Sequence, residues 1–172
     1  TAALGEIAHR RNLRLLFDAA HAFACTTKGQ IVGSFGDAEV FSFHGTKFFN
    51  TLEGGAVTTN DDALAHKIRL MKNFGFTNYD RTDYVGINGK MNEVSAAMGL
   101  TNLESLDEFM AINRQNYQLY QNYLAGVAGV SVIAFDENER YNYQYIVLEI
   151  DPDITGITRD KLVATLHAEN IL

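Results

Sequence analysis

The strongest constraint on the fold is a run of five residues, Arg14 to Asp18, that reads Arg-Leu-Leu-Phe-Asp. A short apolar run that ends in a carboxylate is typical of a strand buried on both faces, with Asp18 at its carboxyl end. Two more runs, 38–43 and 54–59, follow a loop punctuated by glycine and predict further strands. Open α/β sheets bind ligands at the carboxyl ends of their strands, so Asp18 is a candidate site residue.

Helical spacing dominates the rest of the chain. Asp61 or Asp62 is expected to cap a helix, and apolar residues recur in steps of three and four from Asn92 to about Ala125. This second pattern predicts one long helix or two abutting helices. Beyond Gly126, residues 143–150 are expected to form a strand, and Thr158 is expected to cap a final helix.

These patterns predict an α/β protein with a mostly parallel, helix-covered sheet. We expect residues 1–92 to form part of a large domain, 93–126 a long linking helix, and 127–172 the start of a smaller α/β domain. A helical pattern is already under way at the first residues, which indicates that the chain is a fragment. We find no internal repeat and no low-complexity tract.

Composition argues against several classes of function. The formal net charge is -7, which leaves no basic surface for a nucleic acid backbone. The sequence has no apolar run of the roughly 18 residues that a membrane span needs and no signal-peptide pattern, so a cytoplasmic location is expected. Cys25 is the single cysteine. It lacks a partner for an internal disulfide or a metal site, and we expect it to be a small core residue and no metal to be bound.

Three local motifs carry the chemistry. They are Asp18-Ala19-Ala20-His21, then Ser42-Phe43-His44-Gly45-Thr46-Lys47, then Glu53-Gly54-Gly55-Ala56-Val57. Each motif alone is weak evidence, because an aspartate at a strand end is often structural and a lysine after a strand is normally solvated. Their order and spacing together point to one site.

In this order and spacing the chain resembles the DegT/DnrJ/StrS family of nucleotide-sugar aminotransferases, which are fold-type-I enzymes that use pyridoxal 5'-phosphate (PLP). The resemblance covers about residues 14 to 110, and it includes Gly33-Ser34-Phe35-Gly36-Asp37-Ala38 and the segment from Gly86 to Glu93. Residues 127–172 fit the start of the family's small domain in pattern only.

The resemblance implies a role for each motif residue. Lys47 would form the resting imine with the cofactor and later move a proton, while Asp18 would keep the pyridine nitrogen protonated. Ser42 resembles the hydroxyl that contacts the phosphate, and His21 resembles the residue near the phenolic oxygen of the ring. A satisfied interior histidine is the alternative for His21, and His44 is as much a spacer as a contact. The two glycines after Glu53 are expected to allow close backbone packing.

The resemblance also implies a homodimer with shared active sites, in which Asn88 and Lys90 reach the cofactor phosphate or the substrate of the partner subunit. The alternative is an ordinary turn with a solvated lysine. The family's phosphate-binding turn and ring-stacking aromatic lie upstream of the aspartate and are expected to be absent from this chain.

The resemblance therefore implies amino transfer, from glutamate, to the keto carbon of a nucleotide-linked keto-deoxy-sugar. Lys47 argues against the branch of the family that carries histidine there and dehydrates its sugar. Two alternatives remain open at this point. One is a non-catalytic sensor or scaffold with the same fold, and the other is a different fold-type-I PLP enzyme such as a desulfurase or a lyase.

Overall fold

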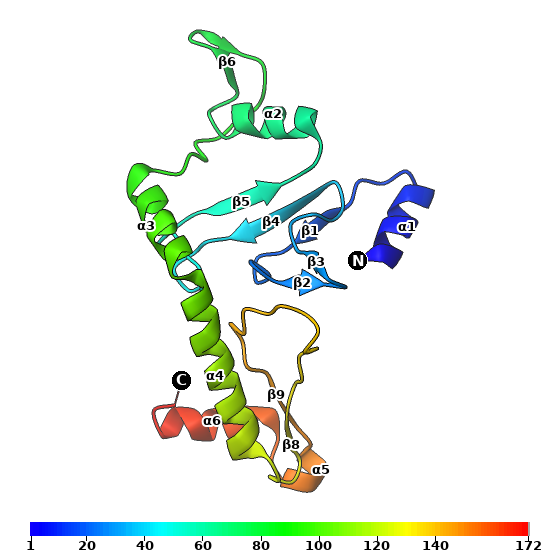
Figure 1. The fold of residues 1–172 in the computed structure, drawn as a ribbon, viewed down its shortest axis with the longest axis vertical. Coiled ribbons are helices and arrows are strands. Elements are labelled where there is room, and N and C mark those ends of the chain that lie inside the picture. The colour runs from blue at the N-terminus through cyan, green and yellow to red at the C-terminus, as the bar shows by residue number, and fades with distance from the viewer. Residues whose placement is uncertain (172) are drawn as a thin grey trace.

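The computed structural model describes residues 1–171 and shows a sheet-containing part joined to a C-terminal unit by a long helical rod (Figure 1). The elements in chain order are α1 (Ala2–Arg10), β1 (Leu16–Asp18), β2 (Thr26–Thr27), β3 (Gln30–Ile31), β4 (Ala38–Ser42), β5 (Gly55–Thr58), α2 (Asp62–Met71), β6 (Phe76–Asn78), β7 (Arg81–Thr82), α3 (Glu93–Glu104), α4 (Leu106–Leu124), β8 (Val130–Val132), β9 (Leu148–Ile150), α5 (Pro152–Thr155) and α6 (Arg159–Ala168). The α/β class expected from the sequence is confirmed.

The main sheet has the strand order β1-β4-β5. β1 and β4 run parallel, as expected, with Asp18 opposite Val40, whereas β5 returns antiparallel to β4. The prediction that β1 is buried on both faces is wrong, because Leu16 is 63% exposed. β1 lies at the edge of this sheet and has one neighbouring strand among the described residues. Leu16 lines a groove of about 500 Å³ together with Leu64 of α2, so that face of β1 is incompletely covered within residues 1–171.

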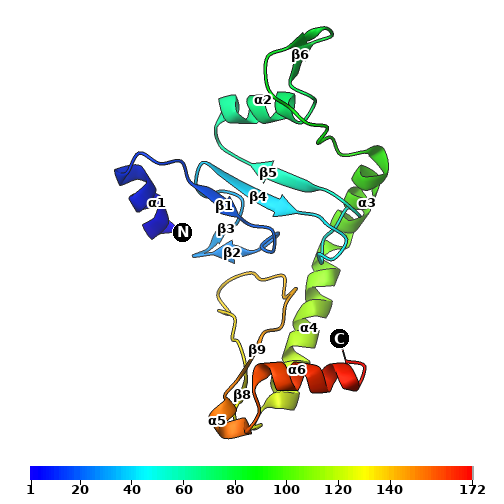
Figure 2. The ribbon, with the colours of Figure 1, turned by 180° about the vertical axis from the view of Figure 1, so that it is seen from behind.

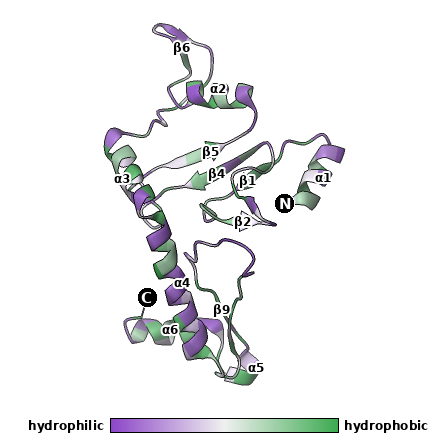
Figure 3. Ribbon diagram, viewed as in Figure 1, coloured by the Kyte–Doolittle hydropathy of each residue, from purple (hydrophilic) through white to green (hydrophobic). Residues whose placement is uncertain are grey.

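The core beside the sheet is aromatic. The rings of Phe23, Phe43 and Phe49 pack in mutual contact, with centroids 4.5 to 5.2 Å apart, and Phe41 of β4 adds an edge contact to Phe23 at 5.8 Å. Hydrophobic residues also mark β4 and β5 in Figure 3, whereas α4 carries many hydrophilic ones. Cys25 is buried, as expected, and burial raises the pKa of its thiol.

Helix caps follow the sequence signals. Asp61 accepts a hydrogen bond from the backbone N–H of Leu64, and Asn92 and Thr158 cap α3 and α6 in the same way. The long helical pattern resolves into the two abutting helices α3 and α4, which meet at Ser105 and run end to end along one side of the molecule (Figure 1). No helix among residues 1–171 is long and apolar enough to cross a membrane.

One strand of the C-terminal unit is shorter than the sequence predicts. The strand predicted over residues 143–150 begins only at Leu148, and β9 pairs antiparallel with β8. Tyr143 has a left-handed backbone (φ 51°), which a strand does not allow, and its ring packs in an aromatic cluster with Phe135 and Tyr117 of α4. Residues 143–147 are therefore not part of a strand, although the Ile133 N–H still donates to the Val147 carbonyl just before β9.

Candidate functional site

The parallel pairing of β1 and β4 brings two predicted site residues to the carboxyl ends of these neighbouring strands. Asp18 and Ser42 are the last residues of these strands. The chain after Asp18 is held to β4 by a bond from the Ala19 N–H to the Val40 carbonyl, 2.9 Å long. One carboxylate oxygen of Asp18 accepts from the Ala20 N–H at 3.0 Å, and the residue is exposed.

The lysine lies on the loop that joins β4 to β5. Phe43 donates its backbone N–H to the Gly54 carbonyl at the base of this loop. At its tip, the Lys47 N–H donates to the His44 carbonyl at 2.9 Å, which makes a tight turn just beyond Ser42. The buried ring of Phe49 anchors the loop to the aromatic core. Lys47 is half-buried, and among the described residues its ammonium has no hydrogen bond or ion pair.

His44 does not bridge the site residues. Its Nδ1 lies 2.9 Å from the Thr46 hydroxyl, and its Nε2 lies 3.5 Å from the carboxylate of Glu53. These contacts stay within the loop and favour the reading of His44 as a spacer that stiffens the turn.

The two glycines at the start of β5 allow close packing, as expected. A Cβ at Gly55 would lie 2.6 Å from the carbonyl oxygen of Phe41, and one at Gly54 would lie 2.5 Å from the Thr51 hydroxyl. Gly54 also has a positive φ of 154°. Neither position can carry a side chain without moving the loop or the strand.

Helix α3 holds the far end of the lysine loop, which the sequence did not predict. Asn102 is buried and donates from Nδ2 to the Asn50 carbonyl at 2.8 Å. One turn earlier, Gly99 packs against the buried side chain of Thr51. The only sequence signal was a glycine and an asparagine three residues apart on an otherwise ordinary helix face.

His21 lies beside the C-terminal unit. It is exposed within the described residues, and its ring is 4.9 Å from that of Tyr145. Its carbonyl accepts a hydrogen bond from Asn142, a buried residue that the sequence analysis also missed. Asn142 carried no local signal, because a lone asparagine in a polar loop is ordinary.

Asn88 and Lys90 make their contacts with each other and with residues near α2. The Lys90 ammonium donates to the Asn88 side chain at 2.6 Å and lies 4.2 Å from the centre of the Phe74 ring. Asn88 pairs with Asn73 in a short β-bridge beside α2. Within residues 1–171 no hydrogen bond or ion pair joins Asn88 or Lys90 to Asp18, Ser42 or Lys47.

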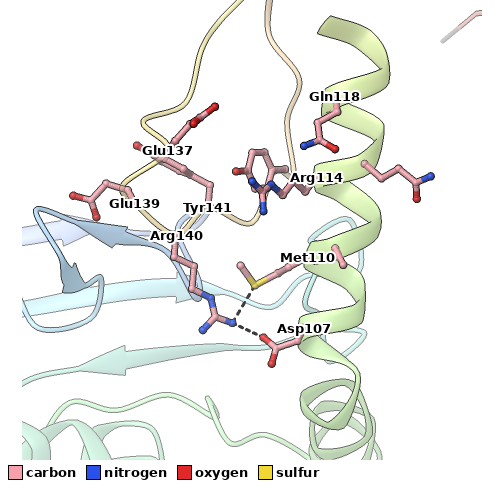
Figure 4. A pocket seen from close by; sticks show the side chains of 11 residues that line it. Asp107, Met110, Arg114, Gln118, Glu137, Glu139, Arg140 and Tyr141 are labelled. Carbon is pink, nitrogen blue, oxygen red and sulfur yellow. Dashed lines mark hydrogen bonds and ion pairs between the residues drawn. The ribbon is translucent and has the colours of Figure 1, made fainter. Parts of the chain in front are cut away.

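A groove of about 520 Å³ lies elsewhere, between α4 and the loop before Asn142 (Figure 4). Arg140 crosses it and donates to the Asp107 carboxylate at 2.6 Å and to the Met110 sulfur at 3.3 Å. None of the predicted site residues lines this groove. Among the described residues, no cluster of three or more His, Cys, Asp or Glu side chains is arranged to hold a metal ion.

Comparison with known proteins identifies relatives over the whole chain. Residues 1–172 match the DegT/DnrJ/EryC1/StrS aminotransferase family. The dTDP-4-amino-4,6-dideoxy-D-glucose transaminase of Shigella dysenteriae is 36% identical over 99% of this chain and 46% of its own length. The GDP-perosamine synthase of Caulobacter vibrioides is 45% identical over 62% of this chain and 29% of its own.

The chain also resembles solved structures over nearly its whole length. The crystal structure of DesI in the presence of its TDP-sugar product is 47% identical and superposes with a TM-score of 0.91 over 98% of this chain and 43% of that one. S. venezuelae DesV in complex with a ketimine intermediate is 27% identical, with a TM-score of 0.84, over 98% of this chain and 44% of its own. The chain spans about half the length of the curated relatives and solved structures that it matches over nearly its whole length.

Proposed function

This chain belongs to the DegT/DnrJ/EryC1/StrS aminotransferase family, and from that premise we propose that its protein is a PLP-dependent aminotransferase acting on a nucleotide-linked keto-deoxy-sugar. The observation that carries the proposal is the arrangement of residues at the carboxyl ends of β1 and β4. Asp18 and Ser42 end neighbouring parallel strands, and Lys47 lies in the turn of the loop that follows Ser42, which supports the proposal.

The side chains at this edge fit the cofactor by their chemistry. PLP has a ring nitrogen that binds a carboxylate, an aldehyde that reacts with an amine, and a phosphate that accepts hydrogen bonds. Asp18, Lys47 and Ser42 supply these three partners, and the Lys47 ammonium has no competing partner among residues 1–171. When bound, PLP supplies the electron sink for carbanion chemistry next to an amino group.

Each residue then has a defined task. With PLP bound, the Asp18 carboxylate would favour the protonated ring nitrogen by charge pairing. The Ser42 hydroxyl would be a hydrogen-bond donor for the phosphate. The Lys47 side chain would hold the cofactor at rest and afterwards move a proton at Nζ, which would require a neutral amine. His21, exposed beside the same strand end, is proposed to face the phenolic oxygen of the ring.

Substrates and partners belong to the same proposal. The names of the relatives include dTDP-linked and GDP-linked amino sugars, which supports a nucleotide-sugar acceptor. Glutamate is the proposed amino donor. Asn88 and Lys90 are proposed to act on the site of the second subunit in a homodimer, which is consistent with the lack of any hydrogen bond or ion pair between them and Lys47 within residues 1–171. The cytoplasmic location expected from the sequence is also part of the proposal.

The test uses the intact protein that contains this chain, supplied with PLP. We expect a visible absorbance band that L-glutamate bleaches and that a nucleotide-linked 4-keto-6-deoxy-sugar restores. Lys47→Ala should remove the band and lower turnover by roughly 10³-fold or more. Lys161→Ala, in α6, is the matched control and should behave as wild type.

Full turnover in Lys47→Ala would refute the roles given to these residues. A stable band without transfer to any keto-sugar would instead favour a non-catalytic protein with this fold. Bleaching by an amino acid that is then desulfurated or cleaved would indicate a different PLP enzyme.

A further inference from the structure

One buried side chain of the C-terminal unit holds the loop that follows Asp18. Asn142 is 5% exposed, although it lies in an irregular segment without helix or strand. Its Nδ2 donates to the carbonyls of His21 at 2.9 Å and Phe23 at 3.1 Å, and its Oδ1 accepts from the backbone N–H of Gln144 at 3.0 Å. Within residues 1–171, the side-chain amide of Asn142 therefore hydrogen-bonds only to backbone groups.

Gln144, two residues later, holds the lysine loop. Its Oε1 accepts from the backbone N–H of Phe48 at 3.2 Å. Phe48 directly follows Lys47, so this bond holds the peptide group that joins the two residues. The Nε2 of Gln144 is buried and has no hydrogen-bond partner among residues 1–171, so the oxygen alone makes the contact.

Further hydrogen bonds hold the segment that carries these two residues. Asn113 of α4 donates to the Asn142 carbonyl at 3.0 Å, and the Glu139 carboxylate accepts from the Thr26 hydroxyl at 2.6 Å. Arg140 is tied to Asp107 of α4 across the groove of Figure 4. Both ribbon views show this segment reaching from the C-terminal unit toward the sheet (Figures 1 and 2).

We propose that Asn142 and Gln144 are positioning residues that hold the Asp18–His21 segment and the Lys47 loop in a fixed relation to each other. The inference rests on the proposed function for its chemical meaning, since the two held segments carry Asp18 and Lys47. Two residues on one short segment act on both, so neither loop can shift without breaking a bond to the same support. Small displacements of reacting groups reduce rates sharply, which gives such a support its value.

The first test measures amide hydrogen exchange in the intact protein as purified, and it requires no turnover. Gln144→Leu removes the acceptor of the Phe48 N–H, and we expect exchange in residues 45–50 to accelerate about tenfold because the loop opens more often. Gln144→Glu keeps an acceptor oxygen and should restore most of the protection. Asn142→Ala should accelerate exchange in residues 19–25. The control, Asn138→Ala, removes a side-chain amide whose hydrogen bond within residues 1–171 goes to Asp136, and it should change neither segment.

The second test measures steady-state kinetics of the same variants loaded with PLP. Gln144→Leu should lower kcat about tenfold while the KM for the nucleotide-sugar stays within about twofold, because the lysine is displaced and the sugar contacts are not. Gln144→Glu should recover most of kcat.

The outcomes separate the two proposals. Wild-type exchange and wild-type kcat in Gln144→Leu, or equal losses in Gln144→Leu and Gln144→Glu, would overturn the positioning role and leave the proposed function intact. Faster exchange in a protein that transfers no amino group would uphold the support of the two loops and refute the proposed function.

Discussion

Substitution of Gly99 by alanine tests how tightly α3 supports the lysine loop. A Cβ built at Gly99 lies 2.8 Å from Cγ2 of Thr51, closer than two carbon atoms can approach without displacement. Thr51 cannot easily yield, because it is 2% exposed and its hydroxyl donates to the Glu53 carbonyl at 2.8 Å. Rotating Thr51 would break that bond, and moving its backbone would shift the loop that carries Lys47.

The expected magnitude is a balance of two terms. Replacing glycine by alanine inside a helix favours folding by about 1 kcal/mol. Inserting a methyl group into a packed contact costs about 1–3 kcal/mol. We therefore expect Gly99→Ala to lower the free energy of unfolding by about 1 kcal/mol. Gly5→Ala is the matched control in α1, where no atom lies within 4 Å of the added Cβ, and it should raise stability by up to about 1 kcal/mol.

Urea unfolding of four proteins isolates the contact: wild type, Gly99→Ala, Thr51→Ser and the double variant. Serine keeps the hydroxyl that bonds to Glu53 and removes the methyl group that blocks the new Cβ. In the Thr51→Ser background, Gly99→Ala should therefore become neutral or stabilising. An equal loss in both backgrounds would show that the methyl contact is not the cause, and the packing argument for α3 would fail.

Two further predictions concern titrating groups. A hydrogen bond from the Leu15 N–H, and then the side chain of Arg14, hold the pKa of Asp37 below its ordinary value. The stabilisation from this carboxylate is therefore present above about pH 4 and is lost as the pH falls through the depressed pKa. Asp37→Asn should lower the urea midpoint at pH 7 and have little effect near pH 2. An equal effect at both pH values would contradict this prediction. Burial raises the pKa of the Cys25 thiol, so iodoacetamide at pH 8 should label it only when urea unfolds the protein, and labelling of the native protein at the rate of a free thiol would contradict the burial.

The features that could be predicted from the sequence are those that neighbouring residues determine. The end of β1 at Asp18, the cap of α2 at Asp61 and the cap of α3 at Asn92 all follow from side chains that act on backbone groups within three residues. The grouping of Asp18 and Ser42 could also be predicted from the sequence, because parallel neighbouring strands that end in polar residues bring those residues together.

The features that could not be predicted depend on contacts between distant segments. Tyr143 sits in a sequence that favours a strand, yet its packing against Tyr117 of α4 imposes a left-handed backbone. Asn102 and Asn142 look like solvated residues in the sequence, and only the fold shows the carbonyls that they hold. The exposure of Leu16 was misjudged because its burial depends on what packs against the face of β1, which the strand's own residues do not determine.

The rod formed by α3 and α4 sets a spacing as well as a connection. Asn102 grips the backbone of the lysine loop, and Asn113, eleven positions further along the same rod, grips the segment that bears Gln144. The break at Ser105 lies between these two residues, so their separation depends on how α3 meets α4, and adding or deleting one residue of α4 before Asn113 would rotate that side chain about the helix axis by about 100°. The position of Asn113 within α4 therefore determines whether the segment that bears Gln144 reaches the loop that carries Lys47.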